Sequence, residues 1–251
     1  MFTEERRRYI VDLLQREGKV VAADLSARLD VSEDTIRRDL RGLARLGVLQ
    51  RVHGGALPRS PSDPRYTVRQ QESPEAKLAI AEAAAQLVRP GQIVIMDAGT
   101  TTLEIAQHLP LDLPATVITN GPPIAIALAE HHMIEVIVVG GELHKPSLAN
   151  IGAATVQAFN AIRADLCFLG VAGVHQEVGV SILAHEEVFV KRAMIDGAGD
   201  VVAVSAGEKL GTVAPYVVGP IDVLSQIVTE RSVPEAVLEP YRRRGISIVL
   251  G

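Results

Sequence analysis

The sequence lacks the features that mark secreted and membrane-spanning proteins. It has a single cysteine, Cys167, inside the apolar run DLCFLGV. This thiol has no partner for an intramolecular disulfide, and we interpret it as a small core residue. No apolar run approaches the roughly 20 residues that cross a membrane, and the beginning MFTEERRRYI lacks the apolar core of a signal peptide. We therefore expect a cytoplasmic protein that makes no membrane contact.

Common cofactor motifs are missing as well. The sequence contains no P-loop, no GxGxxG and no CxxC motif, and we expect no cofactor. One row of three metal-ligand types, His185, Glu186 and Glu187, is present. Consecutive residues on a helix point in different directions and the HExxH spacing is absent, so we interpret this row as a helix start or a solvent-facing surface and expect no bound metal.

Composition and charge indicate a globular chain with two unlike parts. The 251 residues are 47% hydrophobic and 22% charged, which is typical of a globular protein with one small and one medium domain. The formal net charge is −5, yet residues 1–72 carry 14 Lys and Arg against 11 Asp and Glu, a net of +3. The remaining residues carry 11 and 19, a net of −8. This asymmetry favours a small module that binds a polyanion, attached to an acidic body.

A proline-rich segment separates the two parts. Residues 58–71, PRSPSDPRYTVRQQ, contain three prolines and no hydrophobic period, which is typical of a linker. Ser73, Pro74 and Glu75 then have the pattern of a helix start, with an N-cap, a first-turn proline and a first-turn acid. We predict a first domain over 1–57, a linker over 58–72 and a second domain over 73–251.

The first domain has the pattern of three short helices followed by a hairpin. The first helix is capped by Thr3 and ends at Gly18, and a short second helix follows it. Ser32 caps the third helix, in which Ile36, Leu40 and Leu43 recur at i, i+4 and i+7 and must face a core. The strand VLQRV, the turn HGG and a second short strand come next. This order predicts a winged helix-turn-helix with a two-stranded wing.

An exposed basic face on the third helix is the first candidate site. With the apolar positions turned inward, Arg37, Arg38 and Arg41 are left outside, where arginine can hold phosphate or donate to guanine in a major groove about 12 Å wide. The alternative is that these arginines form only a solvated helix face. The ordered set of cap, helix, strand and turn in one basic unit favours DNA binding. The candidate DNA-binding residues are Ser32, Thr35, Arg37, Arg38, Arg41, Arg51, His53 and Gly54.

The second domain alternates apolar, β-branched runs with helical stretches. The runs QIVIM, ATVIT, EVIVV, ADLCFL, DVVAVS and GISIVL have the pattern of buried strands. Such alternation predicts a mainly parallel sheet with helices on both faces, an α/β/α fold. In sheets of this kind ligands bind outside the carboxyl ends of the strands.

The residues also resemble a known family. VSEDTIRRDL followed by QRVHGGAL is very similar to the N-terminal signature of DeoR-type bacterial transcriptional regulators, and the likeness continues through the second domain. The resemblance implies a homo-oligomeric regulator, a dimer or tetramer, and usually a repressor of a sugar or polyol catabolic operon. It further implies that a phosphorylated sugar or polyol releases the protein from its operator DNA, and that the sensor domain is ribose-phosphate-isomerase-like in fold.

Loops at the predicted strand ends form the second candidate site. MDAGTTT, residues 96–102, ends one strand and opens a helix whose hydroxyl and N–H groups suit an anion, although threonines also cap helices without binding anything. Further glycine-rich turns lie at the same predicted sheet edge, and an ammonium group follows a later strand. The candidate effector-binding residues are Asp97, Gly99, Thr100, Thr101, Thr102, Asn120, Gly140, Gly141, Glu142, Gly170, Gly173 and Lys209.

One motif departs from the family pattern. In DeoR-type domains an aspartate and two small hydroxyl residues typically precede the lysine, whereas Ala206, Gly207 and Glu208 precede Lys209 here.

A rival function is that of a sugar-phosphate isomerase with an accessory DNA-binding domain. Isomerisation requires a positioned base and acid, which similar isomerases supply from a DGADE motif. Leu169 and Ala172 of LGVAG stand where those acids are needed, so we predict a sensor and not an enzyme.

Overall fold

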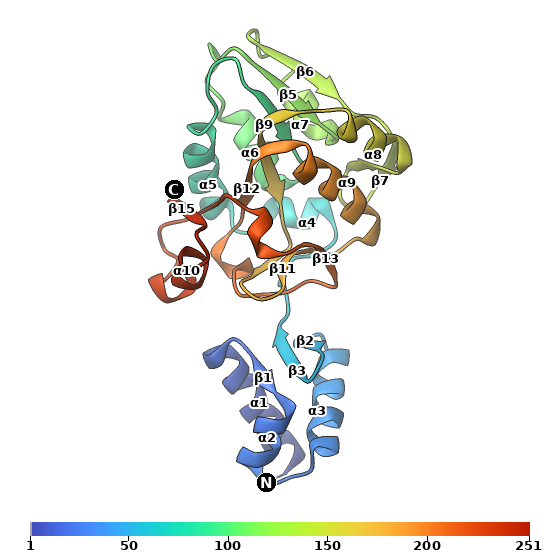
Figure 1. Ribbon diagram of the computed structural model, residues 1–251, viewed down its shortest axis with the longest axis vertical. Coiled ribbons are helices and arrows are strands. Elements are labelled where there is room, and N and C mark those ends of the chain that lie inside the picture. Colours follow the sequence, from blue (N-terminus) through green and yellow to red (C-terminus); the bar gives the residue numbers. More distant parts are fainter. Residues whose placement is uncertain (1) are drawn as a thin grey trace.

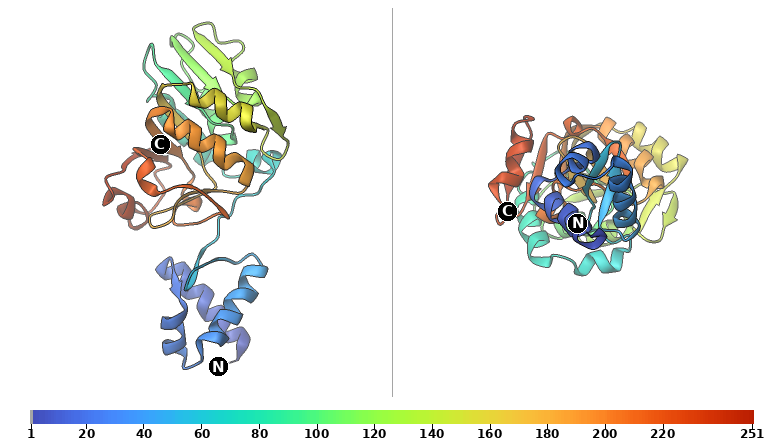
Figure 2. Two further views of the ribbon diagram at one scale, coloured as in Figure 1. Left: turned by 45° about the vertical axis from the view of Figure 1, so that its right-hand side comes forward. Right: turned by 90° about the horizontal axis from the view of Figure 1, so that it is seen from below.

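A small N-terminal body and a larger α/β body are joined by one crossing of the chain in the computed structural model, which describes residues 2–251 (Figure 1). The left view of Figure 2 shows the same two bodies from another side. The division follows the hydrophobic cores, because one cluster of buried side chains belongs to the N-terminal helices and two others belong to the large sheet.

The N-terminal body contains the three predicted helices. Ser32 caps the third, since its hydroxyl accepts the Thr35 N–H at 3.3 Å. The first helix begins at Thr3 itself, and the backbone N–H of Phe2 donates to the Glu5 carboxylate at 2.9 Å, so Thr3 is not the cap that the sequence suggested. Ile36, Leu40 and Leu43 are buried, as predicted. The helices are α1 (Thr3–Glu17), α2 (Ala22–Leu29) and α3 (Glu33–Arg45).

The wing has three strands where the sequence predicted two. β2 (Leu49–Val52) and β3 (Gly55–Pro58) form the expected hairpin, and β1 (Val20–Val21) pairs with the other edge of β3. A side chain at Gly55 would meet the Val20 carbonyl at 2.0 Å, so glycine is what lets β1 approach. A two-residue strand carries no periodicity that sequence analysis could detect. The winged helix-turn-helix prediction is confirmed.

A buried ion pair holds α1 against α3. Asp39 of α3 is 2% exposed and accepts from Arg6 Nε at 2.6 Å and from Arg7 Nε at 3.2 Å. Arg6 is buried as well. The carboxylate therefore has a cationic donor for each of its oxygens, which a buried charge requires.

The larger body is built on a seven-stranded sheet with the order β15-β14-β12-β9-β4-β5-β6. All of its strand pairs are parallel. The mainly parallel sheet is thus confirmed, and β14 is the one strand of it that the sequence analysis did not name. The strands are β4 (Ile93–Met96), β5 (Ala115–Thr119), β6 (Ile134–Val138), β9 (Ala164–Gly170), β12 (Ala198–Val204), β14 (Gln226–Thr229) and β15 (Ser247–Leu250).

Helices cover both faces of this sheet. One core cluster holds apolar side chains of α5 (Pro74–Ala85), α6 (Thr100–Gln107) and α7 (Pro122–Ala127). The cluster on the opposite face holds side chains of α8 (Ala153–Asn160), α9 (His185–Asp196) and α10 (Glu235–Arg242). Between residues 2 and 251, no helix combines the length and the hydropathy needed to cross a membrane.

Several short elements at the carboxyl edge of the sheet were not predicted. A hairpin and a small antiparallel sheet of order β10-β11-β13 lie beside the main sheet. A further short helix, α4 (Tyr66–Gln71), lies in the segment 58–72 that the sequence suggested to be a linker. The remaining elements are β7 (Glu142–His144), β8 (Ala149–Ile151), β10 (Gly173–His175), β11 (Gly179–Ile182), β13 (Tyr216–Gly219), and the single turns η1 (Gly207–Lys209) and η2 (Ile221–Val223).

The strand order fixes where a ligand can bind. From β4 the chain proceeds to β5 and β6 on one side, and it then returns to β9, β12 and β14 on the other side of β4. The order therefore reverses between β4 and β9. The loops that leave the carboxyl ends of two such strands diverge, and this opens a crevice between them.

We predict that Asp39→Ala destabilises the N-terminal body by about 3 kcal/mol, because it leaves the buried Arg6 without its carboxylate. Native-state hydrogen exchange of the full chain measures this as a lower opening free energy for the α1 and α3 amides. Asp12→Ala, which removes an exposed acid of α1, serves as the control and should have little effect. Unchanged α1 and α3 protection in Asp39→Ala would contradict the role of the pair.

Candidate functional site

The exposed face of α3 carries the predicted basic residues, but they differ in whether another group of the protein already binds the guanidinium. The Arg37 guanidinium lies 2.6 Å from Glu33 and 3.7 Å from Asp34. Arg41 Nε donates to the Arg37 carbonyl at 3.3 Å. Arg38 is exposed, and its guanidinium has no hydrogen bond or ion pair within residues 2–251. Arg38 is therefore the arginine of this face that is most available to an external anion.

The hairpin turn contributes a second exposed surface. Arg51, His53 and Gly54 are all exposed at the β2–β3 connection. Gly54 has a φ of +76°, a left-handed conformation that glycine adopts without strain. The structure thus presents a positively charged side chain and accessible backbone at the wing, as DNA-contacting wings do. Ser32, another predicted contact, uses its hydroxyl to cap α3.

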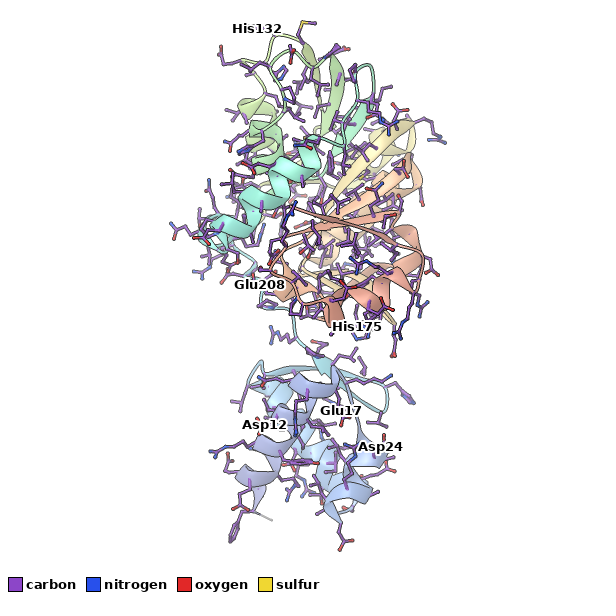
Figure 3. All side chains as sticks on the ribbon, turned by 90° about the vertical axis from the view of Figure 1, so that its left-hand side faces the viewer. Asp12, Glu17, Asp24, His132, His175 and Glu208 are labelled. Carbon is purple, nitrogen blue, oxygen red and sulfur yellow. The ribbon has the colours of Figure 1, made fainter. Side chains whose placement is uncertain are left out.

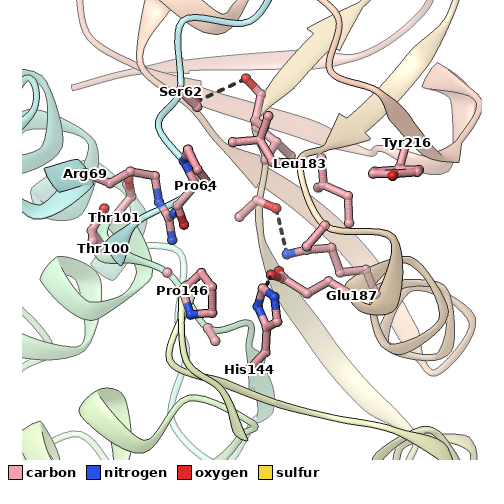
Figure 4. A pocket seen from close by; sticks show the side chains of 18 of the residues that line it. Ser62, Pro64, Arg69, Thr100, Thr101, His144, Pro146, Leu183, Glu187 and Tyr216 are labelled. Carbon is pink, nitrogen blue, oxygen red and sulfur yellow. Dashed lines mark hydrogen bonds and ion pairs between the residues drawn. The ribbon is translucent and has the colours of Figure 1, made fainter. Parts of the chain in front are cut away.

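The second site is a pocket of about 300 Å³ at the carboxyl edge of the large sheet (Figure 4). Gly170 at the end of β9 and Val204 at the end of β12 line it, together with the loop that follows β4. The crevice expected from the strand order is therefore present. The start of α9 and the β7–β8 turn close its other sides.

One wall of the pocket is the N-terminus of α6. Gly99 and the three following threonines line the pocket. The Leu103 N–H is bonded to the Gly99 carbonyl, so the N–H groups of Thr100, Thr101 and Thr102 precede the first intrahelical bond. The Thr102 hydroxyl donates to the Gly99 carbonyl at 3.1 Å. This arrangement leaves backbone donors and a positive helix end directed toward an anion.

Two cationic side chains face the same wall. Lys209 from η1 and Arg69 from α4 both line the pocket. Burial lowers the pKa of Lys209, and the nearby Arg69 guanidinium lowers it further. Glu208 and Glu72 oppose this shift without cancelling it. Two cations held near each other carry an electrostatic cost that an anion between them would reduce.

A buried ion pair supports the floor of the pocket. Lys191 of α9 is bonded to the Asp97 carboxylate and donates to the Gly170 carbonyl at 3.0 Å, while the Gly170 N–H donates to Asp97 at 2.8 Å. Burial raises the pKa of the Asp97 carboxyl, and the Lys191 ammonium opposes that shift. A side chain at Gly170 would meet the Asp97 carboxylate at 3.0 Å, a tight contact with a group that the ion pair holds in place.

The wall opposite α6 carries polar and aromatic groups. His144 Nδ1 lies 3.4 Å from the Glu187 carboxylate, and this contact joins the β7–β8 hairpin to α9. The His185 and Tyr216 rings meet edge to face at a centroid distance of 5.3 Å. Together, carboxylate, imidazole and phenol groups can both donate and accept hydrogen bonds, so this wall differs in chemistry from the cationic wall around α6.

Half of the predicted effector-binding residues line this pocket. They are Gly99, Thr100, Thr101, Thr102, Gly170 and Lys209. The others, which do not line it, are Asp97, Asn120, Gly140, Gly141, Glu142 and Gly173.

Four of the predicted residues that do not line the pocket have structural roles beside it, whereas Glu142 is exposed on β7 and a side chain at Gly140 would meet open space. Asp97 holds Lys191, and the Asn120 side chain accepts the Ala98 N–H at 3.1 Å and donates to the Asn150 carbonyl at 3.0 Å. A side chain at Gly141 would meet the Thr155 hydroxyl at 2.0 Å, and one at Gly173 would meet the Thr212 carbonyl at 2.8 Å. These two glycines therefore permit close packing.

Sequence reasoning missed most of the side chains on the far wall. His185, Glu186 and Glu187 line the pocket, although we interpreted them as a helix start or a solvent-facing surface, and they do begin α9. The first turn of α9 points at the sheet edge, which the sequence does not specify. Arg69 was missed because it lies in the apparent linker. Within the described residues no three His, Cys, Asp or Glu side chains are grouped as metal ligands.

Comparisons with known proteins agree with both halves of this description. Residues 6–61 match the family described as "DeoR-like helix-turn-helix domain", and residues 72–231 match the "DeoR C terminal sensor domain". The resemblance drawn from VSEDTIRRDL and QRVHGGAL is confirmed.

Similar proteins include two regulators and one enzyme. The HTH-type transcriptional repressor GlcR of Bacillus subtilis is 31% identical, covering 100% of this chain and 97% of that protein. The glycerol-3-phosphate regulon repressor of Escherichia coli is 30% identical, covering 98% of each. Among solved structures, ribose 5-phosphate isomerase A of Methanocaldococcus jannaschii is 15% identical and covers 53% of this chain and 52% of its own, with a TM-score of 0.38.

We predict that sulfate affinity of the pocket falls with rising pH at values below the ordinary pKa of lysine. Sulfate keeps its charge across this range, whereas Lys209 loses its proton early because its pKa is lowered. Calorimetric titration of the full chain with sulfate at a series of pH values measures the effect. Lys209→Arg is the matched control, since arginine stays charged and should abolish the fall. A pH-independent affinity in the wild type, or an equal fall in Lys209→Arg, would contradict this assignment.

Proposed function

The chain belongs to the DeoR family of transcriptional regulators, and from that premise we propose that it represses a sugar or polyol catabolic operon until a phosphorylated sugar or polyol releases it. Residues 1–57 hold the operator DNA, and residues 73–251 bind the effector together with Arg69 of the connecting segment. The observation that carries this proposal is one chain with two separate sites, an exposed arginine face on α3 and a pocket lined by Lys209 and Arg69 at the switch point of a parallel sheet. The protein acts where operator DNA is, in the cytoplasm.

Several features support the phosphorylated nature of the effector. The pocket combines free N–H groups at the start of α6 with Lys209 and Arg69. Helix N-termini and cations of this kind bind phosphate. The volume of about 300 Å³ lies at the small end of ligand pockets, and this favours a short, polar compound. One relative is named for a glycerol-3-phosphate regulon, and glycerol 3-phosphate is a short phosphorylated polyol.

The isomerase alternative finds less support. Isomerisation needs a base and an acid at the strand-end positions that Leu169 and Ala172 occupy here. Leu169 is 0% exposed, and Ala172 reaches the pocket with no ionisable group. The two curated relatives described above are named as repressors. Binding followed by a change in DNA affinity is the function that fits these residues.

A homo-oligomer, either a dimer or a tetramer, belongs to the same proposal. A helix-turn-helix pair reads two half-sites about 34 Å or a multiple apart, and two-fold symmetry supplies that pair. The edge strand β6 offers a surface for a second copy, because Ile137 and Val138 are exposed there, with Leu143 and Ile126 nearby in sequence. Exposed apolar side chains on an edge strand favour association.

We predict that Arg38→Ala weakens operator binding by about 10-fold or more, the effect of losing one good contact to guanine. Its affinity for the effector should not change, since Arg38 is on the other body. Fluorescence anisotropy at one fixed salt concentration measures operator affinity. Arg28→Ala, which removes an exposed arginine of α2 paired with Glu17 at 2.9 Å, is the control. Full operator affinity in Arg38→Ala would remove this residue from the DNA interface.

The proposed function itself is tested by titrating the full chain onto DNA from upstream of its own gene, with and without a panel of sugar and polyol phosphates. We expect tight binding that one compound weakens by about 5- to 150-fold, the range of ordinary allosteric coupling. The unphosphorylated form of that compound should have no effect. Binding no tighter than to random DNA, or turnover of a panel compound, would overturn the proposal.

A further inference from the structure

The segment between the two bodies is bound to the sensor domain along its length. Directly after β3, the Ser60 N–H donates to the Val213 carbonyl and the Val213 N–H donates to the Pro58 carbonyl, both at 2.9 Å. Arg59 and Val213 form a parallel bridge. The last strand of the wing therefore leads directly, with no unpaired residues between Pro58 and Ser60, into a region that is paired with the larger body.

This segment is also bonded to the floor of the pocket. The Ser60 side chain is buried and its hydroxyl donates to the Ala172 carbonyl at 2.6 Å. Ala172 lines the pocket directly after β9. The wing strand is thus only two residues away from a hydrogen bond to a pocket-lining residue.

Further along, the segment forms part of the pocket wall. Ser62, Pro64 and Arg69 all line the pocket, and Figure 4 shows Arg69 beside Thr100 and Thr101. Arg69 Nη1 donates to the carbonyls of Asp63 and Pro64 at 3.0 and 2.7 Å. Within residues 2–251 its Nε and Nη2 have no hydrogen-bond partner. One edge of the guanidinium holds the turn at 63–64, and the other is available to an anion in the pocket.

We propose that the segment 59–72 is the coupling element of the sensor, in which Arg69 binds the phosphate of the effector and Ser60 passes the change to the wing. This inference rests on the proposed function. A phosphate at the α6 N-terminus would accept hydrogen bonds from the free edge of the Arg69 guanidinium. The same guanidinium donates to the Asp63 and Pro64 carbonyls, so binding moves this turn or fixes it in place. The hydrogen bonds of Ser60 and the pairing with Val213 transfer this change in the turn to β3 and hence to the DNA-binding body.

The two bodies also contact each other directly. Lys19, in the loop before β1, lies 2.7 Å from Glu177 of the β10–β11 turn, and Figure 3 places His175 at the end of the larger body that faces the small one. A shift at Pro58 therefore changes how the small body sits against the larger one. The placement of the DNA-binding body decides whether the two recognition helices of a dimer match two half-sites.

The first test is Arg69→Gln, with inorganic phosphate and the panel compound that releases the operator as probes. Losing a charge-assisted hydrogen bond should weaken phosphate binding by about 10- to 100-fold. Arg65→Gln is the matched control, because Arg65 lies in the same segment, is exposed, pairs with Asp63 at 3.0 Å and does not line the pocket. Its affinity should remain within about 2-fold of wild type.

The second test separates coupling from binding. Ser60→Ala should keep effector affinity, whereas the ratio of operator affinities without and with effector should fall toward one. Ser60→Thr retains the hydroxyl and should keep the wild-type ratio, and Thr67→Ala, an exposed residue of α4, controls for changes in the segment. Circular dichroism of each variant establishes that it is folded.

The outcomes distinguish this inference from the proposed function. If wild type is released by a sugar phosphate but Arg69→Gln binds phosphate normally, or Ser60→Ala is released normally, the coupling role of the segment is overturned while the function stands. If wild type responds to no compound of the panel, the proposed function itself fails.

Discussion

The buried ion pair between Lys191 and Asp97 is the contact on which the effector pocket depends. It joins the loop after β4, the end of β9 through Gly170, and the first turns of α9, which are the three elements that meet where the strand order reverses. A buried lysine needs a carboxylate and further acceptors, and it finds both here. With this pair in place, the α6 N-terminus and the start of α9 line one cavity.

A similar arrangement holds the DNA-binding body together, where Asp39 accepts from Arg6 and Arg7 behind the exposed face of α3. Each site therefore has a buried charge network behind it and cationic side chains in front, Arg38 on α3 and Lys209 and Arg69 in the pocket. The segment 59–72 connects the two, since it is paired with Val213, bonded to Ala172 and supplies Arg69 to the pocket wall. The pocket and the wing are thus joined by the same short stretch of backbone.

Much of the fold followed from periodicity. The apolar spacing of Ile36, Leu40 and Leu43 identified α3, and β-branched runs identified six of the seven central strands, because these patterns reflect burial. The pocket was harder to predict. Strand-end loops were located correctly, but Asp97 and Asn120 proved to support the wall from behind. Lys191 and Glu187 lie in an ordinary helical pattern, and Arg69 lies in a proline-rich segment. What brings them together is tertiary packing, which no local pattern encodes.

Hydrogen exchange of the full chain, with and without the sugar phosphate that releases the operator, tests this account most directly. Amides of the pocket loops should become protected, and those of the connecting segment should change with them, including Ser60, whose N–H is bonded to Val213. We expect a change in exchange rate that extends from Thr100 through residues 59–72 to β3. Protection restricted to the pocket loops, with unchanged rates in residues 59–72, would contradict it.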